Sequence, residues 1–300
     1  MPASQTIWMP EAEWLYIFPP LADTSPPNAI VAFGSDWLDS AIDAFGLRWR
    51  AVVAPLLAKI GDTECLTVPS HKAVARLHTG KILGLVSSGT TIVHHLEFFQ
   101  QIEPFLAADK LLIEDAGMLY GGKVVLLRLR ANLIPISSDV TMRLVMSMSY
   151  DGSRPPALTC FASNRTWGVD IPCGEVPIKT VNGMPQVPAD LMEYLEAYAD
   201  ADQGVQEQML NTSAQGLVSN FWEDVYRKKQ KTTTTRLTTL YGHLLQFYPE
   251  SKWLAVMAVC IYEDYKLYFS AQEQDRRTDQ CLFGIGAKIK NRAMNLSANQ

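Results

Sequence analysis

The sequence predicts an α+β fold: an antiparallel β-sheet core with flanking helices and a mainly helical C-terminal part. Two observations carry this prediction. Residues 141–150 place Met142, Leu144, Met146, Met148 and Tyr150 on one face and Thr141, Arg143, Ser147 and Ser149 on the other, which is the period of a strand with one buried face. The Asp-Gly-Ser sequence at 151–153 then separates this run from the apolar run 157–163, and a turn of this kind after an alternating strand predicts a hairpin. We therefore expect one sheet face in a core and the other in water.

Four parts follow one another along the chain. Residues 1–35 are rich in tryptophan and proline and are expected to form an irregular arm. Residues 36–168 form the predicted sheet domain. Residues 169–190 contain four prolines and are predicted to be a linker or a long surface loop. Residues 191–300 carry helical periodicity and are expected to pack on the sheet domain.

Within these parts the apolar spacing predicts individual elements. The predicted helices cover 36–60, 94–106, 253–269, a segment from 191 and a segment from 282, and the predicted strands cover 74–77, 82–86 and 123–130. His94 and His95 are adjacent, so they diverge on a helix and are expected to be solvated or capping residues. Glu114 and Asp115 are adjacent on a strand and are expected to point to opposite sides.

Composition describes an ordinary globular chain of 300 residues, long enough for one large domain or two, with 48% hydrophobic and 19% charged residues. No apolar run approaches the roughly 20 residues of a membrane span, and the start lacks a signal-peptide pattern. The five cysteines are widely spaced and form no Cys-x-x-Cys pair, so we expect reduced thiols in a cytoplasmic protein. These are Cys65, Cys160, Cys173, Cys260 and Cys281.

Charge is spread unevenly over the chain, whose net charge is −5. Residues 227–300 hold 12 basic and six acidic residues, a net charge of +6, which leaves −11 for residues 1–226. This asymmetry is compatible with a polyanion site at one end, and equally with an acidic half that packs on a basic half.

Several cations are candidates for contacts with a nucleic-acid backbone. They lie on the predicted sheet, in the basic run 227–236 and on the last helix: Lys123, Arg128, Arg130, Arg143, Arg154, Arg227, Lys228, Lys229, Lys231, Arg236, Lys288 and Arg292. The alternative is a solvated surface whose arginines pair with acids elsewhere in the chain. Tyr150, Phe161 and Trp167 are candidate base-stacking aromatics, although each also suits a core. Lys290 is expected on the other rim of the last helix.

Searches for catalytic motifs find none. The sequence has no P-loop, no His-Glu-x-x-His, no Gly-x-Ser-x-Gly and no calcium loop, and the five histidines show no ligand spacing. The sequence therefore favours a non-enzymatic protein without cofactor or metal, while a site assembled from distant residues stays open. Asp264 falls near the apolar stripe of its helix, either at the edge or paired with Arg276 or Arg277.

Four short motifs in order, spread over residues 75–295, resemble the phage/plasmid-like proteins grouped as domain of unknown function 932. They are Thr79-Gly80-Lys81 to Ser87 followed by Glu97-Phe98-Phe99, Ala116-Gly117 to Val124, Ser149 to Ser153, and Trp253 to Asp264 followed by Phe283-Gly284 and Lys290. The residues shared with the family pattern are Gly80, Gly84, Ala116, Gly117, Gly122, Asp151, Gly152, Ser153, Asn164, Asp264, Gly284 and Lys290. The chain departs from this pattern at Tyr150, where the family has histidine, and at Ala162, where it has cysteine.

The resemblance implies a phage, prophage or plasmid setting and leaves the biochemical role open. With the basic stretches it favours an accessory protein that binds nucleic acid, single-stranded DNA above all, in annealing or recombination. The alternative is a non-enzymatic module that binds a host defence or replication protein, suggested by the acidic half. We expect no membrane partner, and the chain could form a homo-oligomer.

Overall fold

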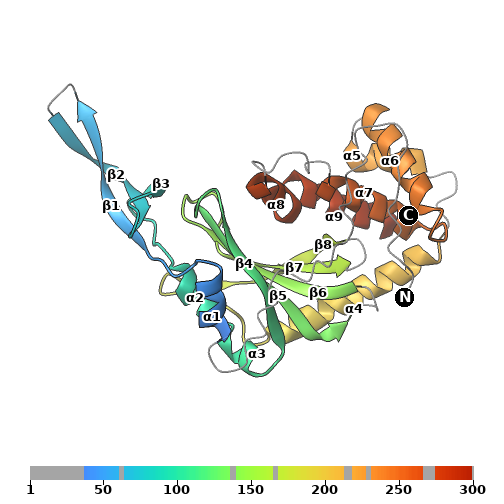
Figure 1. Ribbon diagram of the computed structural model, residues 1–300, viewed down its shortest axis with the longest axis horizontal. Coiled ribbons are helices and arrows are strands. Elements are labelled where there is room, and N and C mark those ends of the chain that lie inside the picture. Colours follow the sequence, from blue (N-terminus) through green and yellow to red (C-terminus); the bar gives the residue numbers. More distant parts are fainter. Residues whose placement is uncertain are drawn as a thin grey trace.

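The computed structural model describes residues 37–60, 64–135, 140–164, 168–212, 218–227, 231–265 and 274–298. It has the predicted α+β class: two antiparallel sheets of several strands, a small hairpin and a mostly helical C-terminal part (Figure 1). The expected N-terminal arm, residues 1–35, lies outside the described residues. No helix in the described ranges has the length and apolar character needed to cross a membrane.

A five-stranded antiparallel sheet forms the centre of the molecule. Its strands lie in chain order as β4 (Leu111–Leu119), β5 (Val124–Pro135), β6 (Val140–Ser149), β7 (Ala157–Asn164) and β8 (Val169–Val176). The predicted hairpin of β6 and β7 is present. Gly152 takes a positive φ of 74° in its turn, and the Asp151 carboxylate accepts a hydrogen bond from the Ser153 N–H at 2.9 Å.

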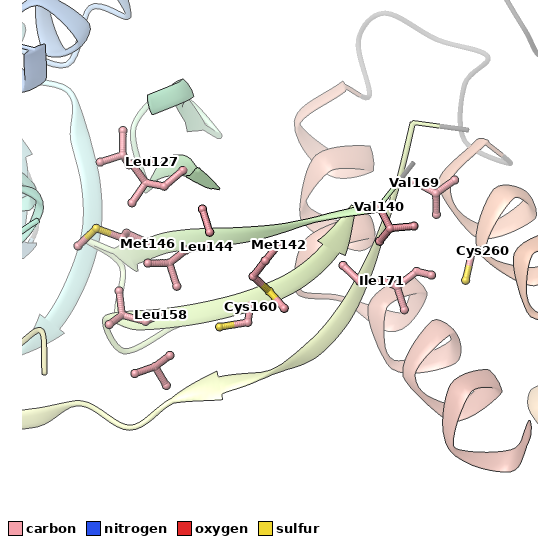
Figure 2. Packing of buried hydrophobic residues seen from close by; sticks show 14 of the residues in the cluster. Leu127, Val140, Met142, Leu144, Met146, Leu158, Cys160, Val169, Ile171 and Cys260 are labelled. Carbon is pink, nitrogen blue, oxygen red and sulfur yellow. The ribbon is translucent and has the colours of Figure 1, made fainter. Parts of the chain in front are cut away.

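The apolar face of this sheet lies in the main core, as the alternation in β6 predicted. Met142, Leu144, Met146 and Met148 are each at most 2% exposed. Figure 2 shows Met142, Leu144 and Met146 beside Leu158 and Cys160 of β7, with Val169 and Ile171 of β8 nearer to Cys260 in the helical region. Helix α4 (Leu191–Leu210) runs along the sheet (Figure 1) and adds Leu191 and Leu195 to the same core.

The opposite face was expected to be wet, and this is wrong for much of it. Leu126, Val145 and Phe161 on that face are buried in a second apolar cluster together with Leu282 at the end of α8 (Gln274–Leu282). Ser147 on the same face is 1% exposed. The alternation in β6 correctly assigned the methionines to the core face, but the other face can also be covered when a later helix packs over it.

A three-stranded sheet precedes the central one, where the sequence predicted a helix over 36–60. Only α1 (Trp37–Ala44) is helical there, and β1 (Ala51–Ile60), β2 (Glu64–Arg76) and β3 (Ile82–Ser87) pair in that order. We call these three strands the β1–β3 arm, because β1 and β2 project away from the body (Figure 1). Pro55 is accommodated because β1 is an edge strand.

The predicted helix 94–106 is two short helices, α2 (His95–Gln100) and α3 (Glu103–Ala107). The break falls at Gln101 and Ile102, just before Pro104 in the first turn of α3. Proline has no N–H to donate to the carbonyl four residues before it, and its ring crowds that carbonyl, so one helix could not run through Pro104. Proline is well suited to the first turn of a new helix, where that N–H has no partner.

Residues 169–190 are not a linker, which corrects the prediction. They contain β8 and the hairpin of β9 (Lys179–Val181) and β10 (Met184–Gln186). Pro172 sits where the register between β7 and β8 shifts, and β8 is an edge strand, so the missing N–H breaks no ladder. The four prolines of this segment therefore lie in irregular strands and turns, and they do not indicate a linker.

The C-terminal part is mainly helical, as predicted. After α4 come α5 (Val218–Tyr226), α6 (Lys231–Leu244), α7 (Lys252–Tyr265), α8 and α9 (Ile285–Ala298). Helix α7 is buried along most of its length, with Val256, Met257 and Val259 at most 1% exposed. It packs against α9, α4 and β8, which joins the helices to the sheet domain.

Candidate nucleic-acid interface

The arginines predicted to form a cationic sheet face are paired with acids. A carboxylate oxygen of Asp115 lies 3.1 Å from Nε of Arg128, and one of Glu114 lies 4.0 Å from Nε of Arg130. Arg143 pairs with Glu114 and, at 2.9 Å, with Asp170 of β8. These pairs neutralise much of the positive charge that the sequence places on this face.

A β-bulge puts both acids of β4 on the side of the arginines, contrary to the expectation that Glu114 and Asp115 diverge. The register shifts between Ile113 and Asp115, so that Glu114 is the additional residue. Burial raises the pKa of Asp115 despite the neighbouring Arg128. Burial also opposes ionisation of Asp170, but Arg143 and Arg128 hold the pKa of that carboxyl below its ordinary value.

Two other predicted cations, far apart in the sequence, meet at one cleft. Arg154 follows the β6–β7 turn and Lys288 lies on α9, and both line a hollow of about 350 Å³ between the sheet and helices α8 and α9. Hydroxyls and an amide line the same cleft, with apolar side chains between them: Ser147, Thr159, Asn291, Leu282, Phe283 and Ala287. Glu175 is the acidic residue that lines this cleft.

The two cations of the cleft differ in how they are held. The Arg154 guanidinium pairs with Asp279 of α8 and lies 4.7 Å from the centre of the Phe283 ring. Its Nη1 is buried and has no hydrogen-bond partner in the described structure. Lys288 is exposed, and its ammonium group forms no ion pair with a described residue. The cleft thus offers one fixed and one free cationic donor.

The remaining predicted cations are scattered. Arg292 donates to the carbonyl of Val225 at 2.6 Å, Lys123 follows the β4–β5 turn, and Arg227 is exposed at the end of α5. Arg236 is exposed on α6, so the second half of the expected basic loop is helical. Lys228, Lys229 and the side chain of Lys231 lie outside what the structure describes. The described cations therefore do not form one continuous surface.

Lys290 is fully buried, which corrects its expected place on a helix rim. Its ammonium group lies 2.7 Å from a carboxylate oxygen of Asp264 and also donates to the carbonyl of Asp170. Lys290 is therefore an ion-pair partner of Asp264 that the sequence did not indicate. Lys290 lies three residues from both Ala287 and Ala293. This spacing could have indicated that Lys290 is buried, because the three residues share one face of the helix.

The candidate stacking aromatics serve the core instead. Tyr150 and Phe161 are at most 1% exposed, and Trp167 lies outside the described residues. The hydroxyl of Tyr150 lies 2.7 Å from Nδ1 of His95, whose Nε2 lies 2.8 Å from the carbonyl of Leu47. The carbonyl can only accept, so Nε2 carries the proton and Nδ1 accepts from Tyr150.

The sequence did not predict the burial of His95, because His94 and His95 were expected to be solvated or capping residues. Burial lowers the pKa of His95 to about 4, so the imidazole is neutral in the folded protein. The centroid of the Trp49 ring lies 4.6 Å from that of the His95 ring, and the Arg76 guanidinium of β2 lies over the Trp49 ring at 4.8 Å from its centroid. A signal was present: His95 shares its helical face with Phe98, Phe99 and Ile102.

The residues of the family pattern are placed at turns, close contacts and strand ends. A side chain at Gly84 would come closer than 3.0 Å to backbone atoms of Tyr150 and Asp151, so the β1–β3 arm meets the β6–β7 turn there. Gly80, Gly122 and Gly152 have positive φ angles. Ala116 and Gly117 lie in β4, Asn164 ends β7, Ser153 lies in the β6–β7 turn and Gly284 precedes α9.

In the described ranges, histidine, cysteine and acidic side chains do not gather in threes that could hold a metal ion. The resemblance to domain of unknown function 932 stays a prediction. In comparisons with known proteins, no family model, no curated protein and no solved structure matches this chain.

Proposed function

We propose that the protein binds single-stranded nucleic acid and that the cleft between β6–β8 and α8–α9 contacts the phosphate backbone. The observation that carries this proposal is the meeting of Arg154 and Lys288 at one hollow, from segments separated by more than a hundred residues. Lysine and arginine are the usual partners of phosphate oxygens, and an exposed lysine without an internal ion pair is free to bind one.

The other lining groups suit the same ligand. The hydroxyls of Ser147 and Thr159 and the amide of Asn291 are donors for phosphate and sugar oxygens. Phe283 and the guanidinium stacked on it offer a planar surface at the side of the cleft. A cleft of about 350 Å³ falls at the small end of the ligand-pocket range, which suits a single nucleotide unit rather than a duplex.

The cationic sheet face has no part in this proposal. Arg128, Arg130 and Arg143 are engaged with acids, and a phosphate would have to compete with carboxylates already in place. A role in annealing or recombination for a phage, prophage or plasmid rests on the sequence resemblance and accompanies the proposal as its biological setting.

Fluorescence anisotropy with labelled single- and double-stranded oligonucleotides of equal length, at two salt concentrations, tests the proposal. We expect tighter binding of the single strand and affinity that falls steeply as salt rises. No binding of either oligonucleotide at low salt would refute the proposal. That result would favour the alternative, a non-enzymatic module that binds a host defence or replication protein.

A further inference from the structure

The β1–β3 arm exposes apolar side chains to an unusual degree. Six of the thirteen large hydrophobic residues that are substantially exposed in the described structure lie between residues 53 and 85: Val53, Leu57, Leu66, Leu77, Ile82 and Leu85, each 49–59% exposed. Both outer strands, β1 and β3, are also sheet edges. A protruding sheet with exposed apolar side chains and open edges is typical of a surface that a partner protein covers.

The charge of the arm restricts the kind of partner. Residues 50–87 contain five basic residues and two acidic ones, a net charge of +3 in a chain whose total is −5. From residue 65 to residue 96 there is no aspartate or glutamate at all, while Lys72, Arg76 and Lys81 lie in this stretch. The complementary partner is therefore an acidic surface with some apolar character.

Such a surface exists on the same chain. Helix α4 contains five acidic residues and no lysine or arginine. Glu193, Glu196, Asp200 and Glu207 are exposed on it, and their spacing of three, four and seven residues places them on one side of the helix. Leu210 at the end of the helix is 49% exposed. Figure 1 shows α4 on the opposite side of the body from the arm, so one chain cannot join the two.

We propose that the arm of one copy docks on helix α4 of a second copy. Each copy then keeps a free arm at one end and a free α4 at the other, so the contact is head-to-tail and repeats into a ring or a filament. This assembly goes beyond the proposed nucleic-acid binding and does not depend on it. If both hold, successive copies would carry successive clefts along one strand.

Light scattering after size-exclusion chromatography of the full chain tests the assembly. We expect a molar mass of several times 33.4 kDa for the natural chain. Leu57→Asp with Leu66→Asp on the arm, and separately Glu196→Lys with Asp200→Lys on α4, should each reduce the mass to that of one chain. The matched controls are Val181→Asp, an equally exposed apolar position, and Asp224→Lys, an exposed acid on α5, and both should assemble like the natural chain.

A mixture of the two defective variants distinguishes head-to-tail from other contacts. The variant changed on the arm retains an unaltered α4, and the variant changed on α4 retains an unaltered arm. The mixture should therefore form a dimer with a mass of twice 33.4 kDa, which neither variant forms alone. A natural chain that remains single, or an α4 variant that assembles normally, would overturn the proposal. So would controls that dissociate, or a mixture that stays single. Circular dichroism establishes that each variant is folded.

Discussion

The ammonium group of Lys290 lies 2.7 Å from a carboxylate oxygen of Asp264, and both side chains are buried where α9 packs on α7. The same ammonium group donates to the carbonyl of Asp170 in β8, so one lysine connects two helices and the edge of the central sheet. Charged groups removed from water are stable only when each is paired, and Lys290 and Asp264 are 0% and 5% exposed.

Removing one partner of this pair should destabilise the fold strongly. Lys290→Ala leaves the Asp264 carboxylate buried without its cation, which costs about 3–5 kcal/mol of unfolding free energy. The double change Lys290→Met with Asp264→Leu should cost much less, because no unpaired charge remains. Urea unfolding of both variants measures the difference. Equal losses in the single and double variants would contradict this account of the pair.

His95 should make the fold less stable as the solution becomes acidic. Its pKa is about 4 in the folded protein and 6.5 in the unfolded chain, so between these values the unfolded chain binds the extra proton. Above pH 6.5 the free energy of unfolding is therefore not reduced by the titration of His95. As pH drops to 4, it falls by up to about 3 kcal/mol. We expect the stability difference between the natural chain and His95→Gln to shrink over this range. A difference that stays constant with pH would contradict a buried neutral imidazole.

Asp202 should have the opposite dependence. Burial raises the pKa of this carboxyl from 3.8 to about 6, although Gln206 and Cys173 donate to it. Below pH 3.8 the carboxyl is protonated in both the folded and the unfolded chain, and the free energy of unfolding is not reduced by Asp202. As pH rises through 6, the free energy of unfolding falls by up to about 3 kcal/mol, because the unfolded chain releases this proton more readily. Asp202→Asn should therefore stabilise the protein at pH 8 and have little effect at pH 4. The exposed neighbour change Asp200→Asn is the control, and a similar effect of both changes at pH 8 would count against the buried carboxyl.

Gly84 should not tolerate a side chain. A methyl group there would come closer than 3.0 Å to the backbone of Tyr150 and Asp151, where β3 meets the β6–β7 turn. Gly84→Ala should cost about 1–3 kcal/mol, because the contact is with backbone that cannot easily move. Gly89→Ala, which has open space around it, should change stability by less than about 0.5 kcal/mol. Thermal unfolding compares the two variants, and equal melting temperatures would show that the arm does not pack this closely.

The sequence predicted those parts of the fold that depend on local pattern. The alternation from Met142 to Met148 was correctly assigned to a strand with a buried apolar face, because a period of two leaves no other arrangement. The strands predicted over 74–77 and 82–86 are present in β2 and β3. Strand β1 was missed because its apolar residues also fit a spacing of three to four, and short runs of this kind suit a helix or a strand equally.

The candidate site depended on contacts that local pattern does not contain. Arg143 is paired with Glu114 of β4 and Asp170 of β8, which lie on either side of it in the sequence and reach it only through the sheet register. A bulge at Glu114 cannot be predicted from residue types alone. Arg154 and Lys288 were both named as candidates, but only the packing of α8 and α9 over the sheet brings them to one cleft.

The salt dependence of single-strand binding tests the central proposal most directly. Anisotropy titrations at several salt concentrations give the slope of log affinity against log salt, which reports the number of phosphate contacts. We expect Lys288→Glu to weaken binding and to reduce that slope by about one, while Lys110→Glu, an exposed lysine beyond α3, leaves both unchanged. Equal slopes for the natural chain and Lys288→Glu would place phosphate outside the cleft and contradict the proposal.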